Sequence, residues 1–152
     1  MSLILATGSN LDNKQENLAK ALAELSKHFN FIAQSSIYTS KAVEYLNQPD
    51  FYNQVLEFEI PSITPQETIK LVLEIEQKFG RRRDVAKGPR TIDIDIIFWG
   101  LEKIHADNLT VPHPAWNQRS FVLNPLKELP FFQTIKQNFD IPTELDNSAS
   151  PI

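Results

Sequence analysis

The sequence predicts an α+β domain in which an antiparallel sheet carries two helices on one face. Two observations support this class. Short apolar, β-branched segments alternate with two segments of helical periodicity, and their order is strand, helix, strand, strand, helix, strand. That order is the βαββαβ, ferredoxin-like pattern, which leaves the other face of the sheet open to ligands. The length of 152 residues fits one domain.

The first half of the chain contains three of the predicted strands. Leu3–Thr7 is apolar and ends at the turn Gly8-Ser9-Asn10. Asp12 or Asn13 can cap a helix whose apolar residues recur at helical spacing, namely Leu18, Leu22, Leu25 and Phe29. The second strand is predicted at Phe31–Tyr38 and the third at Phe51–Ile60. The segment between them, Thr39–Pro49, is predicted to be a loop.

The second helix has the clearest signals. Thr64 is the predicted N-cap, Pro65 stands at the first helical position, and Glu67 completes a capping box. One stripe of this helix carries Ile69, Val72, Leu73, Glu76 and Phe79, and Gly80 ends it.

The remaining elements follow a basic segment. Thr91–Trp99 is the predicted fourth strand, Leu101–Val111 a short hairpin, and Arg119–Leu129 a helix. We expect one domain over residues 1–141 and a disordered tail over residues 142–152, because the tail has no periodicity.

The composition and net charge exclude several kinds of site and classes of protein. The chain has no cysteine, which excludes disulfides and thiolate metal sites and fits a cytoplasmic protein. The N-terminus lacks the features of a signal peptide, and no apolar run approaches the roughly 20 residues of a membrane span. A net charge of −4 argues against a general nucleic-acid binder.

The charge is unevenly distributed along the chain. Lys78–Arg90 contains six basic residues and one acid, a local charge of +5 on an otherwise acidic chain. Such a segment favours a local anion site, for example for a polyphosphate. Taken alone, it is more typical of a solvated, mobile charged loop.

The strongest chemical signal is Asp93 and Asp95 in the fourth predicted strand. Ile92, Ile94, Ile96 and Phe98 are predicted to form one face, so the two carboxylates share the other. Residues two apart lie roughly 7 Å apart along a strand, which suits a pair of magnesium ions. The alternative is a polar outer face of an exposed strand.

Several cations precede or follow this pair. Gly88-Pro89 fixes a turn, and Arg90 either neutralises the carboxylates or binds a transferring phosphoryl group. Arg81 and Arg83 can reach phosphates too, whereas Arg82 is interpreted as a surface residue. His113, between Pro112 and Pro114, either donates to a phosphate or is a structural hydrogen-bonding residue. No G-x-x-x-x-G-K-[ST] motif is present, so any ATP site must be built from side chains.

Two aromatic residues can bind a flat heterocycle. Phe51 and Phe121 could stack on its two faces while Asn53 hydrogen-bonds its edge, although each Phe taken singly is more typical of a core. Glu76 lies on an apolar stripe, where it either binds a ligand or extends its carboxylate into water.

Together these segments closely resemble the 6-hydroxymethyl-7,8-dihydropterin pyrophosphokinase family of folate biosynthesis, from about Leu3 to Leu129. The resemblance lies in Gly8-Ser9-Asn10, Gln48–Phe51 with Asn53, Gly80-Arg81-x-Arg83, Gly88–Asp95 and Val111-Pro112-His113. It implies in-line attack of the pterin hydroxymethyl oxygen on the β-phosphorus of ATP, with release of AMP and no covalent intermediate.

The resemblance also implies roles for individual residues. Asp93 and Asp95 would hold two Mg²⁺ ions and act in catalysis with Arg81 and Arg90. ATP is the co-substrate, and its predicted site contains Glu76, Arg83, Ile96, Thr110, His113 and Arg119. The predicted pterin site contains Thr7, Ser40, Ala42, Val43, Phe51, Asn53 and Phe121.

The chain departs from the family at four positions. Ala86 and Lys87 replace an Arg-Trp pair, and Ala42 and Glu44 replace a Pro and a Gly. These differences keep two alternatives open: a diverged paralogue that uses a modified pterin, and a non-catalytic relative that binds nucleotide or pterin.

RNA binding by an open sheet is a third reading, but the chain lacks the aromatic run of such domains. We expect a monomer that binds no nucleic acid and no membrane.

Overall fold

The computed structural model describes residues 1–41, 49–80, 91–143, 145 and 149–152. The element order begins with strand β1 (Ser2–Ser9), helix α1 (Lys14–Leu25), and strands β2 (Phe31–Gln34), β3 (Tyr38–Ser40) and β4 (Phe51–Glu59). It continues with α2 (Pro65–Lys78), β5 (Asp93–Trp99), β6 (Ile104–Ala106), β7 (Leu109–Val111), α3 (Ser120–Leu126), α4 (Phe132–Asn138) and β8 (Ser150–Pro151).

The main sheet is antiparallel, with the order β5-β1-β4-β3-β8 and with β2 also paired to β4. β2 and β3 are therefore two parts of the single second strand that the sequence predicts, separated by an irregular segment at residues 35–37. This arrangement confirms the predicted α+β antiparallel fold.

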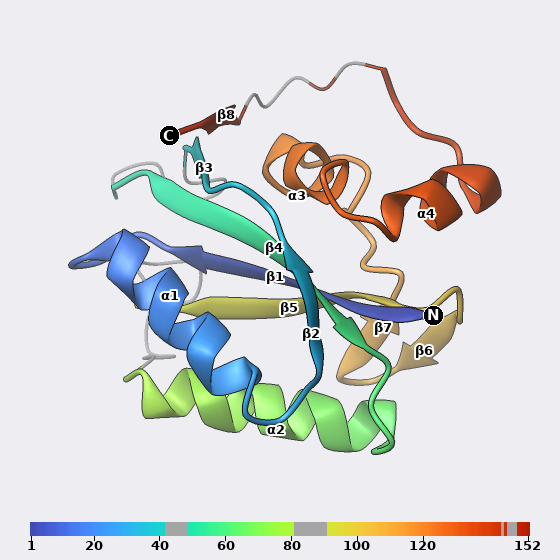
Figure 1. Cartoon of the computed structure of the whole chain (residues 1–152), viewed down its shortest axis with the longest axis horizontal. Helices are drawn as coiled ribbons and strands as arrows, with labels where there is room; N and C mark the ends of the chain where they lie inside the picture. The colour runs from blue at the N-terminus through green and yellow to red at the C-terminus, as the bar shows by residue number, and fades with distance from the viewer. Residues whose placement is uncertain (42–48, 81–90, 144, 146–148) are drawn as a thin grey trace.

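The first two predicted helices begin with predicted caps. The side chain of Asn13 accepts a hydrogen bond from the N–H of Glu16, and Thr64 forms a reciprocal capping box with Glu67. α1 and α2 cover one face of the sheet (Figure 1). The core on that side is formed by buried residues of both helices and the sheet, including Leu3, Leu5, Leu18, Leu25, Phe58, Val72, Ile75 and Ile94.

The opposite face is more covered than predicted. α3 and α4 lie over it (Figure 1), and they enclose a second core that includes Ile4, Val55, Ile97, Phe98, Trp116, Leu123 and Ile135. The expectation of an open face is therefore wrong for this half of the sheet, because α4 and its apolar contacts were not predicted.

Two further predictions are corrected by the strand register. Phe98 packs in this second core and not beside Ile96, because a bulge between Ile4 and Leu5 shifts the pairing with β5. Ser150–Pro151, expected in a disordered tail, forms β8 and pairs with β3. Within the described residues no helix is both long and apolar enough to span a bilayer.

Candidate active site

A row of residues crosses the sheet at the C-terminal end of β1. Gly8 lies opposite Asp93 of β5 on one side and opposite Asn53 of β4 on the other. Directly opposed residues in antiparallel strands place their side chains on the same face. Asp93 and Asn53 therefore flank a glycine on the face that α3 partly covers.

The two carboxylates of β5 both lie on this face. Ile92, Ile94 and Ile96 are buried in the core beneath α1 and α2, so the alternate residues Asp93 and Asp95 point the other way. Both are partly buried, and Asp95 lies opposite Ala6. Among the described residues no group of three or more acidic or histidine side chains could hold a metal. A cation here would need further oxygen ligands from substrate or water.

Glu76 supports β5 from behind. Its side chain is 1% exposed, and its Oε2 accepts a hydrogen bond of 2.8 Å from the backbone N–H of Ile94. β5 is an edge strand of the described sheet, so no described strand pairs with this N–H on that side. The carboxylate therefore does not extend into water, and it holds the residue between Asp93 and Asp95.

Asn53 has a fixed orientation. Its Nδ2 donates to the hydroxyl oxygen of Ser40 at 2.8 Å, and both side chains are buried. A Cβ added to Gly8 would lie 3.4 Å from Asn53 Oδ1 and 3.4 Å from Phe51 Cδ1. Gly8 was not among the predicted site residues, although a glycine within a strand is a known signal of close approach.

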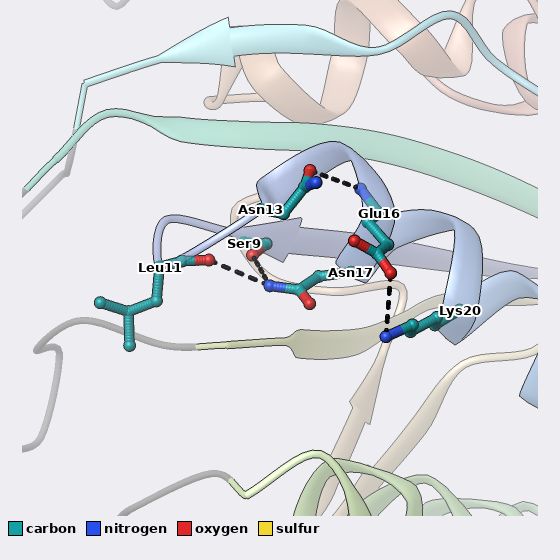
Figure 2. A network of polar contacts seen from close by, with 6 residues as sticks. All are labelled: Ser9, Leu11, Asn13, Glu16, Asn17 and Lys20. Atoms are coloured by element: carbon teal, nitrogen blue, oxygen red, sulfur yellow. Dashed lines mark hydrogen bonds and ion pairs between the residues drawn. The ribbon is translucent and has the colours of Figure 1, made fainter.

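The turn after Gly8 is held by a polar network (Figure 2). Asn17 of α1 donates through Nδ2 to Ser9 Oγ at 3.2 Å and to the carbonyl oxygen of Leu11 at 3.0 Å. Asn10 donates to the carbonyl oxygen of Pro49 at 3.2 Å. These bonds connect the β1–α1 turn to the segment that precedes β4, which explains the Gly8-Ser9-Asn10 motif structurally.

His113 follows a cis Val111–Pro112 peptide bond. Its backbone N–H donates to the carbonyl oxygen of Ile97 at 2.9 Å, which connects it to β5. Its Nδ1 accepts a hydrogen bond of 3.1 Å from the N–H of Ala115. An acceptor Nδ1 places the proton of a neutral imidazole on Nε2, which is then the donor atom for a ligand.

Arg119 and Phe121 lie at the start of α3. Arg119 is the N-cap residue, and its guanidinium carbon lies 5.6 Å from the centre of the Phe121 ring. Such a contact holds an arginine while its N–H groups can still bind an anion. α3 packs against β4, the strand of Phe51 and Asn53.

Some of the predicted site residues lie outside the row formed by Asp93, Gly8 and Asn53. Thr7 and Ile96 share the face of α1 and α2, where the Thr7 hydroxyl donates to the carbonyl oxygen of Gln54 at 3.3 Å and Ile96 is buried in the core. Thr110 lies in β7 opposite His105. Several predictions lie outside the described residues, namely those at Arg81, Arg83, Ala86, Lys87, Arg90, Ala42, Val43 and Glu44.

Comparison with known proteins adds to this geometry. The model of the 7,8-dihydro-6-hydroxymethylpterin-pyrophosphokinase family matches residues 4–130. The chain belongs to this family. Membership confirms the family that the sequence motifs predicted, and with it the class of enzyme, a pyrophosphokinase.

Individual curated proteins are similar to most of this chain. The 2-amino-4-hydroxy-6-hydroxymethyldihydropteridine pyrophosphokinase of Bacillus subtilis is 39% identical over 82% of this chain and 75% of its own length. The protein of the same name from Aquifex aeolicus is 35% identical over 84% of this chain and 79% of its own. The folic acid synthesis protein of Pneumocystis carinii is 36% identical over 84% of this chain but only 17% of its own length.

Proposed function

We propose that the chain transfers the diphosphate of ATP to the hydroxymethyl group of 6-hydroxymethyl-7,8-dihydropterin and releases AMP, as a step of folate biosynthesis. Family membership supports the reaction. The observation that carries the proposal is the row across the sheet in which Gly8 separates the carboxylate of Asp93 from the amide of Asn53. This row offers a cation-binding end and a ring-binding end on one surface.

At the cation-binding end, Asp93 and Asp95 are proposed to hold two magnesium ions. Their donor set fits this ion, which is commonly bound by one or two carboxylates together with substrate phosphates and water. Bound magnesium would neutralise the charge on the phosphate oxygens. Glu76 contributes by fixing Ile94, so that both carboxylates stay on the same surface.

The proposed nucleotide side surrounds these carboxylates. His113 donates through Nε2, and Arg119 offers a guanidinium oriented by the Phe121 ring. These groups position the polyphosphate, and catalysis rests on positioning and charge neutralisation. The remaining residues proposed for this side are Thr110 and the basic residues Arg81, Arg83 and Arg90.

At the ring-binding end, Asn53 is proposed to hydrogen-bond the edge of the pterin. Ser40 sets the orientation of this amide. Phe51 and Phe121 supply aromatic faces for stacking, and the lack of a side chain on Gly8 leaves room for the ring. We further propose that the enzyme is cytoplasmic and that it is a monomer, and light scattering on purified protein would check the monomeric state.

The test is AMP formation from ATP and 6-hydroxymethyl-7,8-dihydropterin, measured with magnesium and with excess chelator. We expect AMP release that requires both the pterin and magnesium. A folded protein that binds ATP but forms no AMP would contradict the proposal. AMP release with only a modified pterin would instead support the diverged paralogue.

Replacing Ser40 with alanine tests the ring-binding end. Loss of the hydroxyl leaves the buried Nδ2 of Asn53 without its acceptor, so we expect the KM for pterin to rise about tenfold while the KM for ATP changes less than about twofold. Steady-state kinetics with each substrate varied in turn would measure both constants. Ser62→Ala, at an exposed serine before α2, is the matched control.

A further inference from the structure

We propose that Glu128 positions the pterin-binding end of the site through Tyr38 and Ser36, in an arrangement called here the Glu128 bridge. This inference rests on the proposed function, because it concerns how the site of that reaction is held. Glu128 and Tyr38 are positioning residues, and neither needs to touch the substrate.

The bridge joins two segments that are distant in the sequence. Glu128 Oε1 accepts hydrogen bonds of 2.9 Å from both the backbone N–H and the hydroxyl of Ser36. Its other oxygen, Oε2, accepts a hydrogen bond of 2.5 Å from the Tyr38 hydroxyl. One carboxylate thus binds three donors, two on Ser36 in the irregular segment between β2 and β3 and one on Tyr38 at the start of β3.

Tyr38 lies beside the proposed pterin site. It is directly opposite Asn53 in the β3–β4 pairing, so the two side chains share a face. Ser40, two residues further along β3, accepts the hydrogen bond of the Asn53 amide. The row that begins at Asp93 therefore continues through Gly8 and Asn53 to Tyr38, and Glu128 holds its far end.

The other end of the bridge lies just after α3. Glu128 follows the C-terminus of this helix, and its N–H donates to the carbonyl oxygen of Pro125 at 3.1 Å. The N-terminal end of α3 carries Arg119 and Phe121. Because the helix packs on β3 and β4, fixing its C-terminal end to β3 also limits where Phe121 can lie.

The charge states suit these hydrogen bonds. Burial, together with the hydrogen bond to Glu128, raises the pKa of Tyr38 to about 12, so the phenol remains a donor at neutral pH. Glu128 is exposed as a residue. Partial desolvation of its carboxylate would by itself raise its pKa, but the hydrogen bonds from Tyr38 and Ser36 outweigh this effect and lower the pKa. The carboxylate is therefore an ionised acceptor over the neutral range.

The irregular segment explains why the chain needs this support. The backbone N–H of Ser35 donates to the carbonyl oxygen of Val55, and the Ser35 hydroxyl accepts from the N–H of Val55. Regular pairing with β4 resumes only at Tyr38. Without Glu128, the N–H of Ser36 would lose its acceptor, and the start of β3 would be held by fewer contacts.

The test uses the full chain and the variants Tyr38→Phe, Glu128→Gln and their combination. We expect each single change to raise the KM for pterin about tenfold, since each weakens a hydrogen bond to a charged group. The KM for ATP should change less than about twofold. The KM for pterin of the double variant should be no higher than that of the more strongly affected single variant, because both changes remove the same contact.

Controls separate positioning from stability. Glu24→Gln changes a partly buried acid of α1 that pairs with Lys27 and Lys78, far from this bridge, and should leave both constants unchanged. Thermal unfolding of every variant gives the accompanying loss of stability. Ser36→Ala removes only one donor and provides a milder variant if the others fold poorly.

Two outcomes would overturn the inference. In the first, the wild-type chain forms AMP but the KM for pterin is unchanged in the variants. In the second, the KM values for both substrates rise together in proportion to lost stability. Failure of the wild-type chain to form any AMP would instead reject the proposed function, and this inference with it.

Discussion

Asp95→Asn should reduce AMP release at least about a thousandfold while the chain stays folded. The change keeps the size of the side chain but removes the negative charge that a hard cation requires. Asp95 lies on the strand face opposite the core isoleucines, so its loss should not disturb packing. The measurement is AMP formation across a range of magnesium concentrations, with circular dichroism to verify folding.

Asp140→Asn is the matched control for this change. Asp140 is exposed just after α4, and neutralising it alters the net charge by the same amount. The Asp140→Asn variant should release AMP at the rate of the wild type. An Asp95→Asn enzyme that keeps wild-type activity at ordinary magnesium concentrations would show that this carboxylate holds no catalytic cation.

Glu76→Ala is expected to have the second largest effect, because it changes both stability and activity. It leaves the N–H of Ile94 without its acceptor at a buried position, which should lower the free energy of unfolding by about 1–3 kcal/mol. Since Asp93 and Asp95 flank Ile94, we also expect kcat to fall about tenfold or more. Urea unfolding and steady-state kinetics measure the two effects.

Glu76→Gln should lie between the wild type and Glu76→Ala, because the amide retains an oxygen acceptor for Ile94. Glu74→Ala removes an exposed acid from the same helix and should change neither quantity. If Glu76→Ala lowered stability without any loss of kcat, the residue would support the fold only.

Local signals predicted most of the architecture. The capping box at Thr64 and the alternation at Asp93 and Asp95 depend on neighbouring residues, so the sequence alone was sufficient to predict them. The bulge that moves Phe98 to the other core depends on the pairing of β5 with β1, which no local pattern reports. The same holds for β8, whose two residues are held by pairing with β3.

The sequence indicated which types of residue form the candidate site, but not the contacts that orient their side chains. Asp93 and Asp95 were predicted to share one face of their strand, and they do. The hydroxyl that orients Asn53, however, comes from Ser40 on another strand. For Glu76 the sequence left a ligand and a water-exposed carboxylate open, and its actual partner is a backbone N–H on β5. Such contacts between distant segments have no signal in a single sequence.

The positions of the two termini affect how the protein can be labelled. Met1 is 73% exposed and precedes a strand that reaches Gly8 only at its far end, roughly 20 Å away at ordinary strand rise. The last residue, by contrast, donates its N–H to the carbonyl oxygen of Ile37, next to Tyr38 (Figure 1). An affinity tag or fluorophore therefore belongs on the N-terminus, where it is remote from the proposed pterin site.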